Sequence, residues 1–495
     1  MSQKKLRHFC CRSWTLLNDL YEFTMAHGYW KANLLDTQAV FHMFYRHNPF
    51  KGGYTIAAGL EGLVEFLDNY GFDETDLEYL STLTGHDDKP LFDLKFIDYL
   101  SSLKFTCDVD AVPEGSVVFP QEPLVRVQGP LINCQLLESP LLTLMNFPSL
   151  IATKASRVCT AAQDDVVIEF GMRRAQGVNG ALMASRAAFI GGCHATSNVL
   201  AGKMFGIPVR GTHAHSWVQV FDDEQQSFQV YAETSPNNCI LLVDTFNTVE
   251  GVKKAIEVGR WLEKQNHKLL GIRLDSGDLA YLSIVAREML DAAGFHDTKI
   301  VASNELDEVL ISEMKRQGAK ISVWGVGTNL VTAKDHPALD GVYKLSAVRH
   351  PGRSWEYKLK LSEQMIKVSN PGILGVRRYQ LDGENVADVI YDINTDISQG
   401  CVVVDPLDAT RHKVLGSGLE NRDLLQPLFR AGKLVYSLPA LEDIRENAKT
   451  ELSCFCPGVK RFFNPHQYIV GMEKSLYDFK IDLINKTRHR ENLTN

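Results

Sequence analysis

Residues 240–303, ILLVDTFNTVEGVKKAIEVGRWLEKQNHKLLGIRLDSGDLAYLSIVAREMLDAAGFHDTKIVAS, decide the fold class. Three short apolar runs, at 240–244, 269–274 and 299–303, are separated by longer segments whose apolar residues recur at helical spacing. Strands that alternate with helices in this way form βαβ units and a parallel sheet. The stretch therefore predicts an α/β fold.

Further apolar runs extend this pattern in both directions along the chain. They lie at 166–170, 187–191, 208–211, 321–325 and 342–346. Together with the first three they make about eight candidate strands, the number that closes a (β/α) barrel. This number favours a closed barrel over an open sheet. Because the count can differ from eight by about one or two, we expect the barrel to be irregular.

The segments on either side of the barrel have a different character. Residues 39–46 alternate like a strand, and 105–130 hold short β-branched runs broken by turn residues, which predicts a small antiparallel unit. Strands and turns are expected after 350, and charged helices from about 420. The predicted domains are an N-terminal α+β segment at 1–137, the barrel at 138–346, and a C-terminal segment at 347–495 that packs with the first.

Composition narrows the class of function. The chain has 495 residues, 45% of them hydrophobic, and a net charge of −8, which argues against a general nucleic-acid binder but allows a small anionic substrate. Its 10 cysteines include no CxxC pair, so we expect reduced thiols and a cytoplasmic location. The basic start, MSQKKLRHFCCRSW, is followed by no apolar run of a secretory signal, and no apolar stretch is long enough to span a membrane.

The chemistry of a (β/α) barrel lies where its strands end. After the run at 166–170 comes GMRRAQG, with Arg173 and Arg174 adjacent. Guanidinium groups bind phosphate oxygens in a bidentate manner, so this pair predicts a phosphate or pyrophosphate contact. The alternative is that one of them pairs structurally with Glu169.

Two histidines follow the run at 208–211, in GTHAHSW. His213 and His215 are two residues apart, so an extended chain turns both to one side, which permits metal ligation and opens the alternative of a metal-dependent hydrolase. The later strand ends offer no further histidine, which disfavours that alternative. What remains is a catalytic or phosphate-accepting histidine, or one that is hydrogen-bonded in the core.

The run at 269–274 ends in GIRLDSGDL. Arg273 and Asp275 share one side if the strand continues that far. Arg273 suits a substrate carboxylate, Asp275 suits ribose hydroxyls or Arg273 itself, and Asp278 is expected to cap the next helix.

The run at 321–325 leads into Gly325-Val326-Gly327-Thr328. Glycines let backbone N–H groups approach an anion, and phosphate sites recur at this position of such barrels. The sequence alone therefore predicts a barrel enzyme for a phosphorylated substrate; the alternative for these glycines is a tight turn.

At these residues the chain resembles the nicotinate phosphoribosyltransferase family. The segments that carry the resemblance include NDLYEFTMAHGY, NFPSLIATKASRV, EFGMRRAQG, GTHAHSW, LLVDTFNT, RLDSGDL and GVGTNLVT, and they run in order over nearly the whole chain. Asn18, where the family more often has Thr, and the CFCPG stretch near 454 depart from the pattern.

The resemblance implies the type II phosphoribosyltransferase barrel and a ligase-classed reaction of NAD salvage. Nicotinate and phosphoribosyl pyrophosphate give nicotinate mononucleotide and pyrophosphate, coupled to ATP hydrolysis through a phosphohistidine. Mg²⁺ is expected with ATP and phosphoribosyl pyrophosphate, without a metal-ligating residue assigned and without an organic cofactor. A homodimer is implied, and no nucleic-acid or membrane partner.

The resemblance also implies roles for single residues. His215 maps onto the phosphohistidine and is expected to be catalytic together with Arg273 and Asp275. Nicotinate contacts map onto Tyr21, Thr212 and Arg273, with Tyr21 reaching the site from the neighbouring subunit. The expected phosphoribosyl and pyrophosphate contacts are Arg173, Arg174, Gly325, Gly327 and Thr328.

A nicotinamide phosphoribosyltransferase is the nearest alternative enzyme. That activity needs an acidic residue that reads a carboxamide in the loop after the third strand. This chain has Thr212-His213-Ala214 there, and Arg273 is left for a carboxylate. The residues therefore favour nicotinate.

Overall fold

The computed structural model describes residues 14–494 and divides the chain into two compact units. The first consists of residues 1–150 and 338–495, and the second of residues 151–337. Helix α6 (Glu138–Ala162) runs through the boundary at 150. The Cys10-Cys11 pair lies outside the described residues, and the domain limits expected at 137 and 346 stay a prediction.

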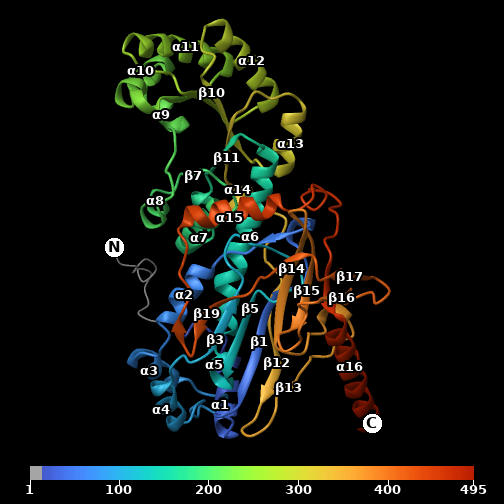
Figure 1. Ribbon diagram of the computed structural model, residues 1–495. Coiled ribbons are helices and arrows are strands. Elements are labelled where there is room, and N and C mark those ends of the chain that lie inside the picture. Colours follow the sequence, from blue (N-terminus) through green and yellow to red (C-terminus); the bar gives the residue numbers. More distant parts are fainter. Residues whose placement is uncertain (1–13, 495) are drawn as a thin grey trace. The chain divides into compact units, whose positions relative to one another are not determined.

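The second unit is built on a sheet of six parallel strands in the order β7-β6-β11-β10-β9-β8. Figure 1 labels β7, β11 and β10 of this sheet. These strands are β6 (Val166–Glu169), β7 (Ala195–Thr196), β8 (Ile240–Leu242), β9 (Gly271–Leu274), β10 (Lys299–Asn304) and β11 (Val323–Val326). The helices between them are α7 (Gly177–Ile190), α8 (Val199–Phe205), α9 (His215–Gln219), α10 (Glu224–Thr234), α11 (Thr248–Lys264), α12 (Leu279–Ala292), α13 (Glu308–Arg316) and α14 (Thr328–Val331), with 3₁₀ turns at η2 (Met172–Arg174) and η3 (Pro236–Asn238).

The sheet curls into a half-barrel, and one loop joins its two edge strands. The N–H of Thr196 in β7 donates to Pro208 O at 3.0 Å, and the N–H of Arg210 donates back to Thr196 O at 3.0 Å. At the other edge, the N–H of Leu242 in β8 donates to His213 Nε2 at 3.1 Å. The α/β class and the irregular barrel are thus confirmed, with a loop where a regular barrel has strands.

The predicted strands differ in outcome. The runs at 166–170, 240–244, 269–274, 299–303 and 321–325 hold β6 and β8 to β11. The prediction at 187–191 was wrong because these residues end helix α7, and 208–211 makes only a bridge from Val209 to Thr196. The run at 342–346 is a strand, but it belongs to β12 in the first unit.

The first unit contains two larger sheets. One has the order β13-β12-β1-β5-β3-β19-β20, and the other β17-β16-β21-β15-β14-β18. Strand β1 pairs with β5 on one side and with β12 on the other, so early and late parts of the chain share one sheet. This confirms the additional α+β domain formed from both terminal segments.

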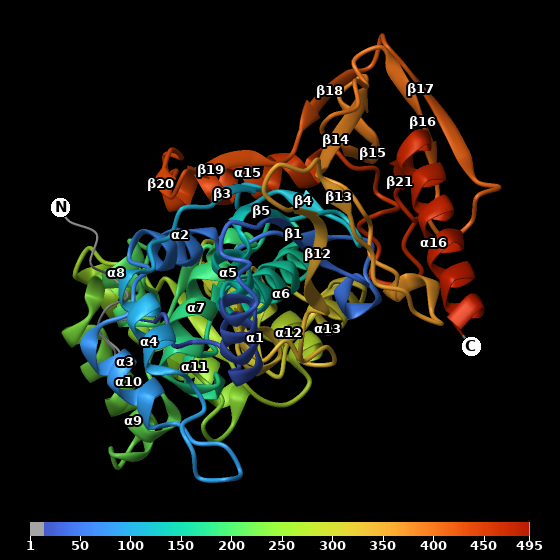
Figure 2. The same cartoon turned by 90° about the horizontal axis from the view of Figure 1, so that it is seen from below.

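The strands of the first unit are β1 (Gln38–Tyr45), β2 (Thr55–Ile56), β3 (Asp108–Ala111), β4 (Val117–Val118), β5 (Val125–Pro130), β12 (Gly341–Arg349), β13 (Glu356–Tyr357), β14 (Leu374–Leu381), β15 (Glu384–Asp392), β16 (Gly400–Val404), β17 (His412–Gly416), β18 (Glu420–Asp423), β19 (Gln426–Arg430), β20 (Lys433–Leu434) and β21 (Val470–Glu473). Its helices, besides the start of α6, are α1 (Leu20–Lys31), α2 (Leu60–Asp68), α3 (Glu74–Thr82), α4 (Leu94–Ser102), α5 (Leu131–Gln135), α15 (Leu441–Ser453) and α16 (Lys474–Thr494), with 3₁₀ turns at η1 (Pro49–Lys51) and η4 (Met365–Lys367). The prediction of helices from about 420 was wrong for 420–434, which hold β18, β19 and β20, and it is confirmed from 441 onward by α15 and α16. Figure 2 shows α16 beside β16 and β21, which it contacts.

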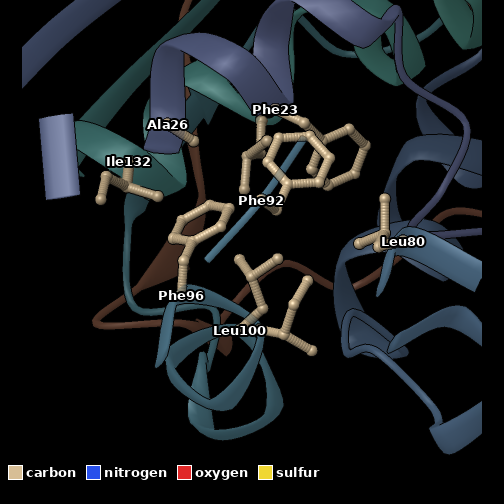
Figure 3. Packing of buried hydrophobic residues seen from close by; sticks show 9 residues of the cluster. Phe23, Ala26, Leu80, Phe92, Phe96, Leu100 and Ile132 are labelled. Atoms are coloured by element: carbon tan, nitrogen blue, oxygen red, sulfur yellow. The ribbon is translucent and has the colours of Figure 1, made fainter. Parts of the chain in front are cut away.

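An aromatic cluster forms the core beneath α1. Phe23 of α1 packs against Phe92 with ring centroids 6.5 Å apart, and Phe92 against Phe96 of α4 at 5.8 Å (Figure 3). All three rings are buried. Burying side chains of this size stabilises the fold by about 1.5–3 kcal/mol each, so the cluster holds α1 to α4.

Within the described residues no helix is both long and apolar enough to cross a membrane.

Candidate active site

The polar side chains predicted from the strand ends gather at the carboxyl edge of the parallel sheet. Arg273 lies in β9, Ser303 in β10, and Asp244 two residues after the end of β8. In a parallel sheet all these ends open onto one side, which is where (β/α) barrels hold their chemistry.

Arg273 is the centre of this group. Its Nε donates to Ser303 Oγ at 2.9 Å, Nη1 donates to Thr212 Oγ1 at 2.8 Å and to His213 O at 3.3 Å, and Nη2 donates to Asp275 Oδ1 at 3.2 Å. Four of the five N–H groups of the guanidinium are thus engaged. The side chain is only 15% exposed, so these bonds hold its charge in a largely buried position.

Asp275 is fixed from both its side chain and its backbone. Its Oδ1 accepts from Ser303 Oγ as well as from Arg273, and its N–H donates to Asp244 Oδ2 at 2.6 Å. Asp244 Oδ2 also accepts from Ser276 Oγ at 2.8 Å, while its buried Oδ1 has no hydrogen-bond partner in the described part of the chain. Arg273 and Asp275 lie together as expected, although β9 itself ends at Leu274.

His215 is the first residue of α9 and is half-buried. Its Nδ1 lies 3.1 Å from Thr245 Oγ1, and its Nε2 lies 3.6 Å from Asp275 Oδ2. The imidazole is therefore connected to Arg273 through one shared carboxylate. Such a ring, held on one side and 38% exposed, suits a nucleophile.

His213, unlike His215, has a structural role. It is buried, its Nε2 accepts the N–H of Leu242, and its ring packs edge-on against Tyr231 at 4.7 Å. Burial lowers the pKa of His213 to about 4, so the ring is neutral at pH 7 and keeps its lone pair for that N–H. His213 is thus the hydrogen-bonded core histidine among the alternatives open for the pair. The rings of His213 and His215 contact different residues. No group of three or more His, Cys, Asp or Glu side chains arranged for a metal occurs among the described residues.

Arg173 and Arg174 lie in η2, directly after β6, and both are exposed. Glu169 does not bind them: its carboxylate accepts from the Gly171 N–H, from Ser185 Oγ at 2.9 Å and from Thr196 Oγ1 at 2.6 Å. Both guanidinium groups therefore face solvent at the carboxyl end of β6.

The glycines of the GVGT loop have a packing role that the sequence did not reveal. A Cβ on Gly325 would lie 2.5 Å from Cδ2 of Phe170, so only glycine fits against that ring. Phe170 follows β6, and the Arg273 guanidinium lies 5.9 Å from its ring centroid. Thr328 Oγ1 donates to Glu305 Oε1 at 3.2 Å. The predicted phosphate contacts of Gly325, Gly327 and Thr328 stay a prediction.

Phe170, Ser303 and Thr245 are site neighbours that sequence reasoning did not assign. Ser303 lies in β10, Phe170 directly follows β6, and Thr245 lies in the loop after β8, and this placement is the signal that could have identified them. Tyr21 lies on α1 in the first unit and is 45% exposed, and burial together with the nearby charge of Glu138 raises its pKa. Its predicted contact with nicotinate stays a prediction.

Comparison with known proteins identifies relatives over almost the whole chain. Models of the nicotinate phosphoribosyltransferase N-terminal domain, family and C-terminal domain match residues 16–146, 166–358 and 375–480. The nicotinate phosphoribosyltransferase of Bacillus subtilis is 41% identical over 97% of this chain and 96% of its own length. The human protein of that name is 32% identical over 93% and 95%.

Solved structures show the same likeness. The crystal structure of human nicotinic acid phosphoribosyltransferase superposes with a TM-score of 0.82 at 30% identity, over 94% of this chain and 100% of that one. A nicotinate-nucleotide pyrophosphorylase from Pyrococcus furiosus shares the fold, with a TM-score of 0.67 at 21% identity over 90% and 99%.

Proposed function

Because the chain belongs to the nicotinate phosphoribosyltransferase family, we propose that nicotinate, phosphoribosyl pyrophosphate and ATP all bind at the carboxyl end of its parallel strands. The enzyme makes nicotinate mononucleotide and pyrophosphate from the first two substrates, a step of NAD salvage. Which residues serve each substrate, and how ATP is coupled, are the parts that we propose.

Arg273 and Thr212 bind nicotinate. The guanidinium is positioned by Ser303, Thr212 and Asp275, and it offers its remaining N–H and its charge to the substrate carboxylate. The ring of Phe170, 5.9 Å from that guanidinium, supplies an apolar wall for the pyridine. With the carboxylate held, the ring nitrogen faces the anomeric carbon, so that the N–C bond forms as pyrophosphate leaves.

Arg173, Arg174 and the GVGT loop bind the phosphorylated ends of phosphoribosyl pyrophosphate. The two exposed guanidinium groups stabilise the charge that develops on the departing pyrophosphate. Mg²⁺ enters with this substrate and with ATP, and it neutralises phosphate charge. Carboxylate oxygens are the ligands that Mg²⁺ prefers; Asp275 at the mouth and the buried Asp244 Oδ1, which lacks a hydrogen-bond partner in the described residues, fit that chemistry.

His215 accepts the phosphoryl group of ATP. The observation that carries this proposal is the contact chain from His215 through Asp275 to Arg273, with 3.6 Å and 3.2 Å steps. A phosphoryl group on His215 adds about two negative charges beside the carboxylate that positions Arg273. The phosphorylation state therefore acts on the residue that binds nicotinate.

We also propose a cytoplasmic homodimer in which Tyr21 reaches the partner's site. The eight cysteines in the described part of the chain are free, as in a reducing compartment. Leu20, Tyr21 and Met25 of α1 are 52%, 45% and 38% exposed, a cluster that a second copy would cover. Light scattering checks the mass, and synthesis by mixed dimers of Tyr21→Ala and His215→Ala chains checks the shared site.

The experiment measures nucleotide formation from phosphoribosyl pyrophosphate and Mg²⁺ with nicotinate or nicotinamide, with and without ATP. We expect nicotinate mononucleotide to form preferentially, and faster with ATP. His215→Ala should abolish the stimulation by ATP and leave some synthesis, while His296→Ala, an exposed histidine far along the chain, serves as the matched control. An unchanged ATP dependence in His215→Ala would remove this residue from the coupling.

A further inference from the structure

The two ring nitrogens of His215 have different surroundings. Nδ1 lies 3.1 Å from Thr245 Oγ1, within hydrogen-bond reach. Nε2 lies 3.6 Å from Asp275 Oδ2, which is longer than a hydrogen bond. One nitrogen is therefore held by a hydroxyl group, and the other faces the cluster at the strand ends.

Thr245 is itself held by its chain neighbours. Asp244, one residue before it, accepts from the N–H of Asp275 and from Ser276 Oγ. Asn247, two residues after it, caps α11 by accepting the N–H of Glu250 at 3.0 Å. Because the backbone is anchored on both sides, the Thr245 hydroxyl has a defined position, which a hydroxyl on a mobile loop would lack.

We propose that Thr245 is a positioning residue that selects Nε2 of His215 as the phosphate acceptor. The inference rests on the proposed function of His215. When the Nδ1–H group donates a hydrogen bond to Thr245 Oγ1, the neutral ring carries its lone pair on Nε2, directed toward the mouth. The sequence motifs assigned no role to Thr245.

The phosphoryl transfer then balances as follows. The Nε2 lone pair forms a bond to the γ-phosphorus of ATP, and the bond from that phosphorus to the bridging oxygen breaks, its electron pair leaving with ADP. The Nδ1 proton stays on the ring, bound to Thr245 Oγ1. Later attack of water on phosphorus returns the ring and releases phosphate.

This choice of nitrogen links the step to Arg273. A phosphoryl group on Nε2 places negative charge beside Asp275 Oδ2, which lies 3.6 Å from that nitrogen, so the two groups repel each other. Asp275 keeps its contacts with Ser303 and Arg273 through Oδ1. Phosphorylation on Nδ1 would instead displace Thr245 and leave the contact to Asp275 in place.

The test combines phosphorus NMR of the phosphoenzyme with rapid-quench measurement of its formation from ATP. In the wild type we expect phosphohistidine on Nε2. Thr245→Val, which replaces the hydroxyl by a methyl group of similar size, should slow phosphoenzyme formation about tenfold and mix the two isomers. Thr245→Ser should restore both rate and isomer, and Thr248→Val, at the first residue of α11, is the matched control.

The outcomes separate the two proposals. Phosphohistidine on Nδ1 in the wild type, or a Thr245→Val enzyme with the wild-type rate and isomer, would overturn the role of Thr245 alone. An absence of phosphoenzyme in the wild type, or its persistence in His215→Ala, would overturn the proposed role of His215 as well.

Discussion

Replacing Arg273 with lysine tests how the site recognises a carboxylate. The guanidinium holds Ser303 at 2.9 Å, Thr212 at 2.8 Å and Asp275 at 3.2 Å at the same time. A lysine ammonium is a single point charge with three donors, so it cannot reach all of these partners and also present an N–H to the substrate. The change keeps the charge and removes the planar geometry.

The expected loss follows from the contacts that disappear. A hydrogen bond between charged groups contributes about 1.5–3 kcal/mol, so losing the one to the substrate carboxylate costs up to about 3 kcal/mol. That corresponds to a fall of roughly 150-fold in kcat/KM for nicotinate. Nicotinamide carries no charge at this position, and its weaker turnover should change less than about fivefold.

The assay measures kcat/KM for both bases under the same conditions. Arg316→Lys, an exposed arginine on α13, is the matched control and should behave as the wild type. An equal fall for nicotinate and nicotinamide would refute the assignment, because it would show that Arg273 only supports the structure.

Two further predictions concern the scaffold of the site. His213 is protonated near pH 6.5 in the unfolded chain and only near pH 4 in the folded chain, so the free energy of unfolding falls by about 3 kcal/mol from this residue as pH drops through this range. Urea unfolding of His213→Asn should show a shallower decline of this free energy with falling pH. The same decline in the variant and the wild type would contradict the prediction. Gly325→Ala places a Cβ 2.5 Å from the Phe170 ring and should destabilise the protein by about 1–3 kcal/mol. Thermal unfolding checks this against Gly416→Ala, which meets nothing within 4 Å, and equal melting temperatures would show that the ring moves aside freely.

Local patterns predicted most of the strands of the barrel because their β-branched runs lie between clear helices. They failed at 187–191, where AAFIG is an apolar run of a length that suits either element and in fact ends α7. They also missed β7, whose two residues are too few for a pattern. The run at 342–346 was predicted as a strand correctly, but its partner, β1, lies some three hundred residues earlier in the chain and no local signal reveals it.

The histidine pair shows the same limit within the site. The two-residue spacing predicted that His213 and His215 face one way, whereas one ring binds the N–H of Leu242 and the other lies between Thr245 and Asp275. The loop leaves its extended course at His215, where α9 begins, so the alternation of an extended chain does not hold across the pair.

By itself the sequence determined the α/β class, the strand ends that carry charge, and, through its motifs, the family to which the chain belongs. These properties depend on residue type and local spacing, which a linear chain displays. The tertiary structure alone decided which partner each polar group has: Arg273 binds Thr212, 61 residues away, and Arg378 is fully buried against Asp388 and Glu451. Hydrogen bonds and ion pairs are short-range, so they depend on the distances that folding sets between residues remote in the chain.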